Sequence, residues 1–168
     1  MTKSELSLRL ARPADAAAIA NLSRDLIEYG LQWRWTPIRV AASIRAADVN
    51  VLIACIDENI AGFAIMRYGE EDAHLDLLAV APAYRRAGVG RQLLEWLEKC
   101  AVVAGIFRVA LEVRAGNEGA QLFYKRMGYR PLVHLAGYYQ GIEAAPRMGR
   151  DLSRRPLDHK ICCRRKGA

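Results

Sequence analysis

The apolar and polar residues of the chain follow two periodicities, one typical of strands and one of helices, and together they predict an α/β protein. Short apolar runs are typical of strands, whereas apolar residues recurring at i, i+3 and i+4 are typical of one helix face. Segment 88–104 shows the helical periodicity, with Leu93 and Leu97 on an apolar face and Glu95 and Glu98 on a polar face. We also expect a helix opening at Pro13, helices within 37–48 and 117–127, and strands at 7–10, 51–56, 60–67, 74–80, 107–114, 129–135 and 148–152.

The order of these elements predicts a mixed sheet of about six or seven strands flanked by helices. Asp57-Glu58-Asn59 is typical of a tight turn, so the strands on either side of it should form a hairpin. After residue 74, strands alternate with helices, which predicts right-handed crossovers and parallel pairing. Because the hydrophobic pattern fades after Leu152, we expect a single domain over residues 1–152 and a flexible basic tail over 153–168.

The composition of the 168 residues, 52% hydrophobic and 26% charged, is that of an ordinary globular protein. The net charge of +7 could indicate a nucleic-acid binder, but residues 147–168 alone hold 8 Lys and Arg against 2 Asp and Glu. That tail carries no aromatic residue, so we interpret it as solvated and do not expect it to form a nucleic-acid site. No apolar run approaches the length of a membrane span, about 18 residues, so we expect a cytoplasmic protein.

The four cysteines, Cys55, Cys100, Cys162 and Cys163, show no spacing typical of a disulfide framework and are interpreted as free thiols. Together with His159, the last two could form half of a metal site. No second ligand pair follows to complete a tetrahedron, so we expect no metal.

The turn between the strand ending at Val80 and the helix after it predicts a phosphate site. Pro82 stops the strand, and glycines at the start of a helix expose unpaired N–H groups to an anion. A dinucleotide-binding turn is the competing interpretation, but Leu93 occupies the position where its third glycine would stand. The turn that should hold a pyrophosphate consists of Arg85, Arg86, Ala87, Gly88, Val89, Gly90 and Arg91.

Several motifs, taken in order, resemble those of the GNAT N-acetyltransferases over about residues 60–150. The stretch Val80-Ala81-Pro82 followed by Arg85-x-x-Gly88-x-Gly90 resembles the family's acetyl-coenzyme A signature. The later stretches resemble the RimI-like branch, which acetylates protein N-termini and is typified by a ribosomal-protein alanine acetyltransferase; they are Leu111-Glu112-Val113-Arg114-Ala115-Gly116-Asn117, Ala120, Phe123-Tyr124 and Met127-Gly128-Tyr129. The resemblance implies a GNAT fold and acetyl-CoA as cosubstrate.

The resemblance also assigns roles to individual residues. Glu112 matches the general base and Tyr124 the general acid, with His74 and Asp76 as reserve bases. Without the family resemblance, Glu112 could belong to a surface ion pair, Tyr124 to the core, and Asn117 could be a helix N-cap. Residues implied to hold acetyl-CoA are Leu78, Ala79 and Val80 on a free strand edge, residues 85–91, and Asn117.

The acceptor that the resemblance implies is a protein or peptide N-terminal α-amine. Tyr138 and Tyr139 resemble an aromatic loop that holds a peptide, and Trp33 and Trp35 are either pocket walls or core-capping aromatics. A small amine, such as a polyamine, amino acid or aminoglycoside, is the alternative acceptor, and a non-catalytic coenzyme A-binding module is the alternative function. A monomer and a homodimer are both compatible with the sequence.

Overall fold

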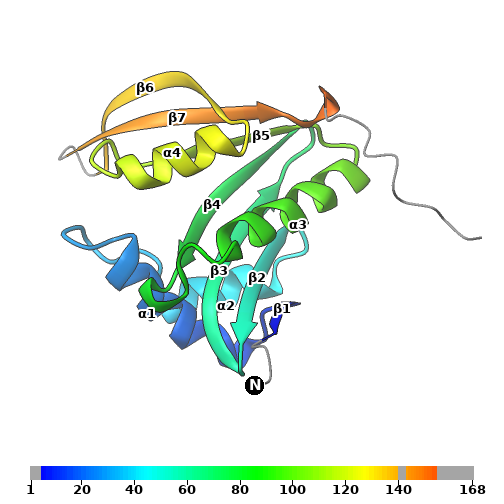
Figure 1. Ribbon diagram of the computed structural model, residues 1–168, viewed down its shortest axis with the longest axis vertical. Coiled ribbons are helices and arrows are strands. Elements are labelled where there is room, and N and C mark those ends of the chain that lie inside the picture. The colour runs from blue at the N-terminus through cyan, green and yellow to red at the C-terminus, as the bar shows by residue number, and fades with distance from the viewer. Residues whose placement is uncertain (1–4, 140–142, 155–168) are drawn as a thin grey trace, which may run out of the picture.

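A computed structural model describes residues 5–139 and 143–154, which form one seven-stranded mixed sheet covered by helices (Figure 1). The strand order is β1-β2-β3-β4-β5-β7-β6. This arrangement confirms the expected α/β fold with a mixed sheet. The strands are β1 (Leu6–Leu10), β2 (Val49–Ile56), β3 (Asn59–Tyr68), β4 (Asp72–Val80), β5 (Arg108–Glu112), β6 (Arg130–Tyr139) and β7 (Glu143–Asp151), and the helices are α1 (Ala16–Leu26), α2 (Pro37–Arg45), α3 (Val89–Val103) and α4 (Glu118–Arg126).

The β2–β3 hairpin forms where the sequence predicts it. Asp57 and Glu58 connect the strands with φ values of 48° and 65°. Positive φ at both central residues is typical of the tight turn whose twist matches that of paired strands. The hairpin prediction is therefore confirmed.

The parallel pairing predicted for the second half is right for one crossover and wrong for the next. Strands β4 and β5, joined through α3, pair in parallel. Strand β6, which follows α4, instead pairs antiparallel with β7, and β7 lies between β5 and β6. Because β7 returns directly after β6 and occupies the free edge of β5, the second crossover cannot bring β6 against β5.

The helices divide the core into two layers, one on each face of the sheet. Leu93 and Leu97 of α3 pack with β2, β3 and β4 on one face. Ile19 of α1 and Val40 of α2 pack with Phe63 on the other face. The sheet is therefore packed on both faces, by α3 on one and by α1 and α2 on the other. This packing holds the strand ends in fixed positions.

Glu98 departs from the expected pattern, because it lies inside the core. Its side chain is 0% exposed, accepts a hydrogen bond from the Tyr129 hydroxyl at 2.9 Å, and pairs with Arg150 Nη1 at 3.0 Å. The expectation that Glu98 belongs to a solvated face of α3 is therefore wrong. Burial raises the pKa of Tyr129, so its hydroxyl keeps its proton and acts as a donor to the carboxylate. This buried group ties α3 to β7.

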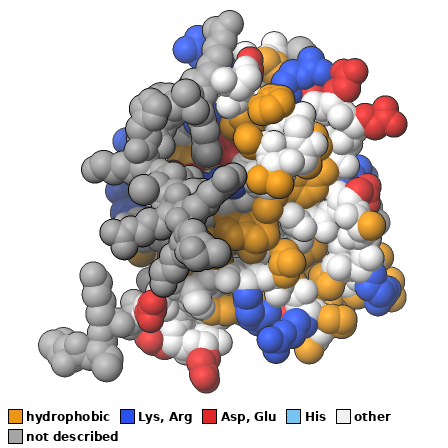
Figure 2. All heavy atoms as spheres, turned by 90° about the vertical axis from the view of Figure 1, so that its right-hand side faces the viewer, with side chains coloured by type: hydrophobic (Ala, Val, Ile, Leu, Met, Phe, Trp, Pro, Cys, Tyr) orange, Lys and Arg blue, Asp and Glu red, His pale blue; other side chains and the backbone are white. Residues whose placement is uncertain are grey.

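Charged side chains of both signs are scattered over the part of the surface that Figure 2 draws in colour. Hydrophobic side chains lie near the middle of that face, with Lys, Arg, Asp and Glu around them. The described part of this face therefore shows no continuous basic band of the kind that nucleic-acid binders carry. The first two residues of the predicted tail, Ser153 and Arg154, form a short 3-10 helix with Leu152, and the rest of it, with His159, Cys162 and Cys163, lies outside the described residues.

No helix within 5–139 and 143–154 is both long and apolar enough to cross a bilayer. The same residues contain no group of three or more His, Cys, Asp or Glu side chains placed to hold a metal ion.

Candidate active site

A cleft of about 1360 Å³ opens between the ends of β4 and β5. The start of α3 and one side of α4 line it at one end, and the connection between α1 and α2 lines it at the other. A site between diverging strands is a common place for a ligand in sheets of this kind.

The cleft exists because β4 and β5 separate. Among the described residues, their pairing runs only from Asp72–Arg108 to Leu75–Leu111. Next to the last pair, the β3–β4 register shifts, so that Met66 pairs with Leu75 but Ile65 with Leu77. Such a bulge inserts one extra residue, bends the strand and redirects the side chains that follow it.

The freed edge of β4 presents backbone donors to the cleft. Ala81 donates its N–H to Ala61 on β3 at 2.8 Å. Because N–H directions alternate along a strand, those of Leu78 and Val80 point the other way, into the cleft, and that of Ala79 points toward β3. Arg85 Nε also reaches this edge and donates to the Val80 carbonyl at 3.2 Å.

The start of α3 supplies a second set of donors. Gly88 is the N-cap, with a φ of 77°, and Arg86 before it has a φ of 62°. A Cβ at Gly88 would meet nothing within 4 Å, whereas one at Gly90 would lie 3.4 Å from Phe123 Cζ. Gly88 is therefore needed for the shape of the turn, whereas a Cβ at Gly90 would make only an ordinary contact with Phe123 on α4.

Cationic side chains surround this helix start. Arg85, Arg86 and Arg91 all line the cleft, and Arg91 Nε is bound to Glu95 at 2.9 Å. A 15-residue helix with unpaired N–H groups and nearby arginines has the chemistry that binds a pyrophosphate. Ala87 belongs to the same turn.

Asn117 lies at the opposite wall and caps α4. Its side-chain oxygen accepts a hydrogen bond from the Ala120 N–H at 3.1 Å. The N-cap interpretation of Asn117 is confirmed, and the residue also lines the cleft.

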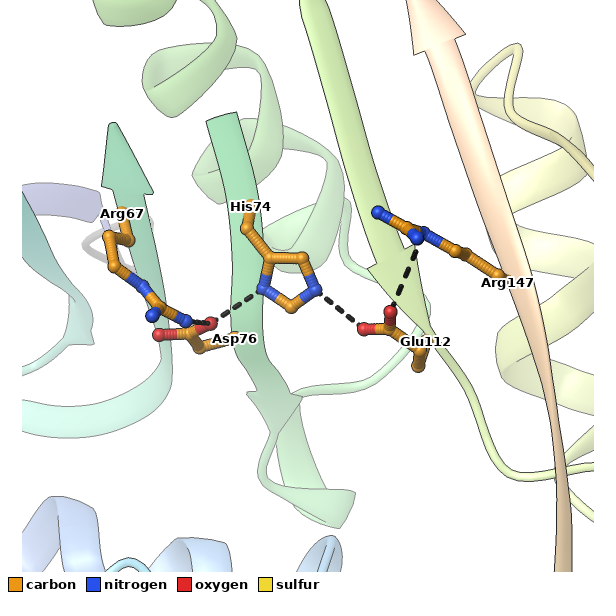
Figure 3. Close-up of polar contacts among 5 residues, drawn as sticks. All are labelled: Arg67, His74, Asp76, Glu112 and Arg147. Carbon is orange, nitrogen blue, oxygen red and sulfur yellow. Dashed lines mark hydrogen bonds and ion pairs between the residues drawn. The ribbon is translucent and has the colours of Figure 1, made fainter. Parts of the chain in front are cut away.

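The predicted base belongs to a chain of charged groups that spans the split between the strands (Figure 3). His74 Nε2 lies 2.5 Å from Glu112 Oε2, and His74 Nδ1 lies 2.6 Å from Asp76 Oδ1. Arg67 Nη2 lies 2.6 Å from the same Asp76 oxygen, and Arg147 Nε lies 3.6 Å from Glu112 Oε1. The predicted base and the two reserve bases are therefore one hydrogen-bonded unit, with an arginine at each end.

Two carboxylates on one imidazole determine its charge. Hydrogen bonds to Asp76 and then Glu112 raise the pKa of His74 to about 9, against the opposing effect of burial. Burial alone would raise the pKa of Asp76, but hydrogen bonds from His74 and Arg67 bring it below its usual value. His74 is therefore a cation near neutral pH and donates from both ring nitrogens. The hydrogen bonds from His74 to Asp76 and Glu112 were not predicted from the sequence. The i, i+2 spacing of His74 and Asp76, which puts both on one face of β4, was the available signal.

Tyr124 projects from α4 into the cleft wall. It is 6% exposed and makes edge-on contacts with Phe123 and Tyr129, with ring centroids 5.1 and 5.7 Å away. The core interpretation of Tyr124 thus holds for its ring, while the residue also borders the cleft opposite β4.

The connection between α1 and α2 carries both candidate tryptophans, and the structure places them differently. Both pack against the core layer under α1 and α2, but Trp35 also lines the cleft, whereas Trp33 is not among the lining residues. The structure therefore favours the core-capping interpretation of Trp33. Tyr138 and Tyr139 end β6 as backbone, and their side chains lie outside what the structure describes.

Comparison with known proteins gives one family and consistent relatives. A model described as the acetyltransferase (GNAT) family matches residues 17–129. The [ribosomal protein bS18]-alanine N-acetyltransferase of Salmonella typhimurium is 37% identical over 92 residues, which cover 53% of this chain and 62% of that protein. The catalytic subunit naa20 of the N-terminal acetyltransferase B complex of Schizosaccharomyces pombe is 34% identical over 92 residues, covering 55% of this chain and 51% of that protein. The chain thus spans roughly half to two thirds of the length of these relatives.

Solved structures match over more of the chain. Ard1 from Thermoplasma volcanium superposes with a TM-score of 0.78 and 25% identity, covering 88% of this chain and 97% of that one. The ribosomal-protein-S18-alanine N-acetyltransferase from Escherichia coli superposes with a TM-score of 0.77 and 25% identity, covering 92% and 98%.

Proposed function

The chain belongs to the GNAT acetyltransferase family, and from that premise we propose that it transfers the acetyl group of acetyl-CoA to the α-amine of a protein or peptide N-terminus. The observation that carries the proposal is the split between β4 and β5, which puts free N–H groups of β4 across a cleft from Glu112. Each of these features has a role in acyl transfer.

The residues of the cleft fit acetyl-CoA. The inward N–H groups of Leu78 and Val80 suit an extended amide chain that adds to the strand edge. The N-terminus of α3, with Arg85, Arg86 and Arg91, suits its pyrophosphate. Bound there, acetyl-CoA supplies an acetyl group activated as a thioester.

Glu112 takes up the proton that the acceptor amine loses, through a water molecule or directly. An α-amine has a pKa near 8 and is already about one-tenth neutral at pH 7, whereas a lysine near 10.4 costs about 4.6 kcal/mol to deprotonate there. Because Glu112 is held by His74 and Arg147, it suits the less demanding α-amine.

The transfer itself is a single substitution. The neutral amine forms a C–N bond with the acetyl carbon as the C–S bond breaks, and Tyr124 gives its hydroxyl proton to the departing sulfur. The nitrogen then loses its second proton to give the neutral amide, and that proton restores the Tyr124 hydroxyl through solvent. A strand N–H directed into the cleft stabilises the negative charge on the carbonyl oxygen. No cysteine within the described part of the chain lines the cleft, which supports direct transfer over an acyl-cysteine route.

The test is intact-mass detection of acetylated product with peptide N-termini, lysine-containing peptides blocked at the N-terminus, and polyamines. We expect acetylation of free peptide N-termini at one α-amine per molecule. Acetylation confined to lysines or polyamines would reassign the acceptor, and coenzyme binding without any product would make the protein a non-catalytic binder.

Tyr124→Phe tests the acid role. We expect it to slow coenzyme A release at least tenfold while coenzyme affinity measured by calorimetry stays within about twofold. Tyr68→Phe is the matched control, because the Tyr68 hydroxyl bonds to Asn50 and to the Leu97 carbonyl away from the cleft. Equal turnover by wild type and Tyr124→Phe across pH would remove Tyr124 as the acid.

A further inference from the structure

The acceptor end of the cleft is bounded by residues 27–36, the connection between α1 and α2, which we name the acceptor wall. Glu28 organises it from inside. This carboxylate is 8% exposed and accepts hydrogen bonds from the Ser23 hydroxyl at 3.0 Å, the Arg34 N–H at 2.7 Å and the Trp35 N–H at 3.3 Å. A buried carboxylate bound to two backbone N–H groups fixes the course of this connection.

Arg114 fastens the acceptor wall beside the acid–base groups. It follows Glu112 by two residues and donates from Nη1 to the Tyr29 carbonyl at 2.8 Å and to the Ile27 carbonyl at 3.4 Å. Its guanidinium also lies 4.3 Å from the centre of the Tyr29 ring. The acceptor wall therefore borders the part of the cleft that lies beside Glu112.

Two arginines on this side of the cleft are available to such an acceptor. Arg34 belongs to the acceptor wall and Arg39 to the first turn of α2; both are exposed and line the cleft. The Arg39 guanidinium is held 4.1 Å from the centre of the Trp35 ring, which orients it without neutralising it. Among the side chains that the structure describes, neither arginine has a carboxylate partner.

The carboxylates of the same region are already engaged. Asp25 is paired with Arg24 at 2.8 Å, and Glu28 is bound to the backbone of the acceptor wall. Asp76 and Glu112 are held by the network around His74. The acceptor end therefore has unsatisfied positive charge and no corresponding unsatisfied negative charge among these groups.

We propose that the preferred acceptor carries a carboxylate near its α-amine, as an Asp or Glu side chain among the first residues of the peptide. The inference rests on the proposed function, because it describes the acceptor of that same reaction. Arg34 and Arg39 bind the acidic side chain while the amine lies at Glu112. Polycationic acceptors such as polyamines are repelled by the same two charges.

The experiment compares peptides that are identical except for one side chain. Acetylation rates are measured for matched peptides with Glu, Gln or Lys at the second, third or fourth position, at low and high salt. We expect kcat/KM for a Glu peptide to exceed that of its Gln counterpart by about fivefold or more at low salt, the size expected for two partly exposed ion pairs. Salt should reduce this ratio, because it screens exposed charges.

The Arg34→Gln, Arg39→Gln double variant should bring the Glu-to-Gln ratio close to one. Arg45→Gln is the matched control: it removes an exposed arginine from the last turn of α2, outside the cleft lining, and should keep the ratio. Equal rates for Glu and Gln peptides, or a preference for Lys, would overturn the inference while leaving N-terminal acetylation standing. If no peptide is acetylated at all, the proposed function fails as well.

Discussion

Replacing His74 by glutamine removes the cation that lies between two carboxylates, and the cost should depend on pH. The pKa of His74 rises from 6.5 to about 9 in the folded protein, chiefly through hydrogen bonds to Asp76 and Glu112. The folded protein therefore binds this proton more tightly than the unfolded chain does. The stabilisation is fully present below pH 6.5 and is lost as the pH rises through about 9.

The size of the effect follows from the same values. A rise of this extent corresponds to about 3 kcal/mol in the free energy of unfolding. Because the His74 side chain is 30% exposed, solvent screening reduces this to about 2 kcal/mol. Wild type should lose that much stability relative to His74→Gln between pH 6 and pH 10.

Urea unfolding of both proteins at pH 6, 8 and 10 measures this difference directly. Groups that titrate alike in the two proteins cancel in the comparison, so the remaining pH dependence belongs to position 74. A difference in unfolding free energy that stays constant over the three pH values would refute the assignment of His74 as a cation bound by both carboxylates.

Three further predictions concern other parts of the site and its support. Glu112→Gln should lower kcat at least about 100-fold with little change in coenzyme affinity by calorimetry; a rate within a fewfold of wild type would exclude Glu112 as the base. Gly88→Ala places a Cβ at a φ of 77° and should cost about 1 kcal/mol of stability in thermal unfolding and weaken coenzyme binding; unchanged values would contradict the N-cap argument. Glu98→Gln leaves Arg150 without its carboxylate and should cost about 3 kcal/mol in urea unfolding, well above Tyr129→Phe at about 1 kcal/mol; equal costs would refute the buried ion pair.

Local signals predicted much of the fold. The turn at Asp57 and Glu58, the amphipathic helix with Leu93, and the glycine at its start act within a few residues of the chain. Patterns of this range carry their own physical cause, such as a required φ or a repeating apolar face. The position of Gly88 at the N-terminus of α3 could therefore be predicted from the sequence alone.

Long-range contacts could not be predicted from the sequence in the same way. The insertion of β7 between β5 and β6 depends on which free edge a returning strand finds, and the burial of Glu98 depends on Tyr129 and Arg150, which lie 31 and 52 residues away. Glu98 follows Leu94 by four positions and precedes Ala101 by three, so it borders the apolar face of α3, and only its charge assigns it to the polar face.

The candidate site contains some residues that local sequence motifs identified and others whose contacts depend on long-range pairing. The roles given to Glu112 and Tyr124 came from motif resemblance, and they stay predictions. The contact between His74 and Glu112 joins residues 38 apart and exists only because β4 and β5 lie side by side before they separate. Trp33 and Trp35 differ by two positions, and only the packing of the acceptor wall decides which one reaches the cleft.

The short ladder between β4 and β5 has a mechanical consequence. Four residue pairs join a block formed by β1 to β4 to a block formed by β5, β7 and β6. Because Glu112 belongs to one block and the donors of Leu78 and Val80 to the other, a ligand that lies in the split contacts both blocks at once. The blocks are also joined by the Glu98–Arg150 pair and by the bond from Arg114 to the Tyr29 carbonyl, so a ligand enters a cleft whose two walls are already held in place.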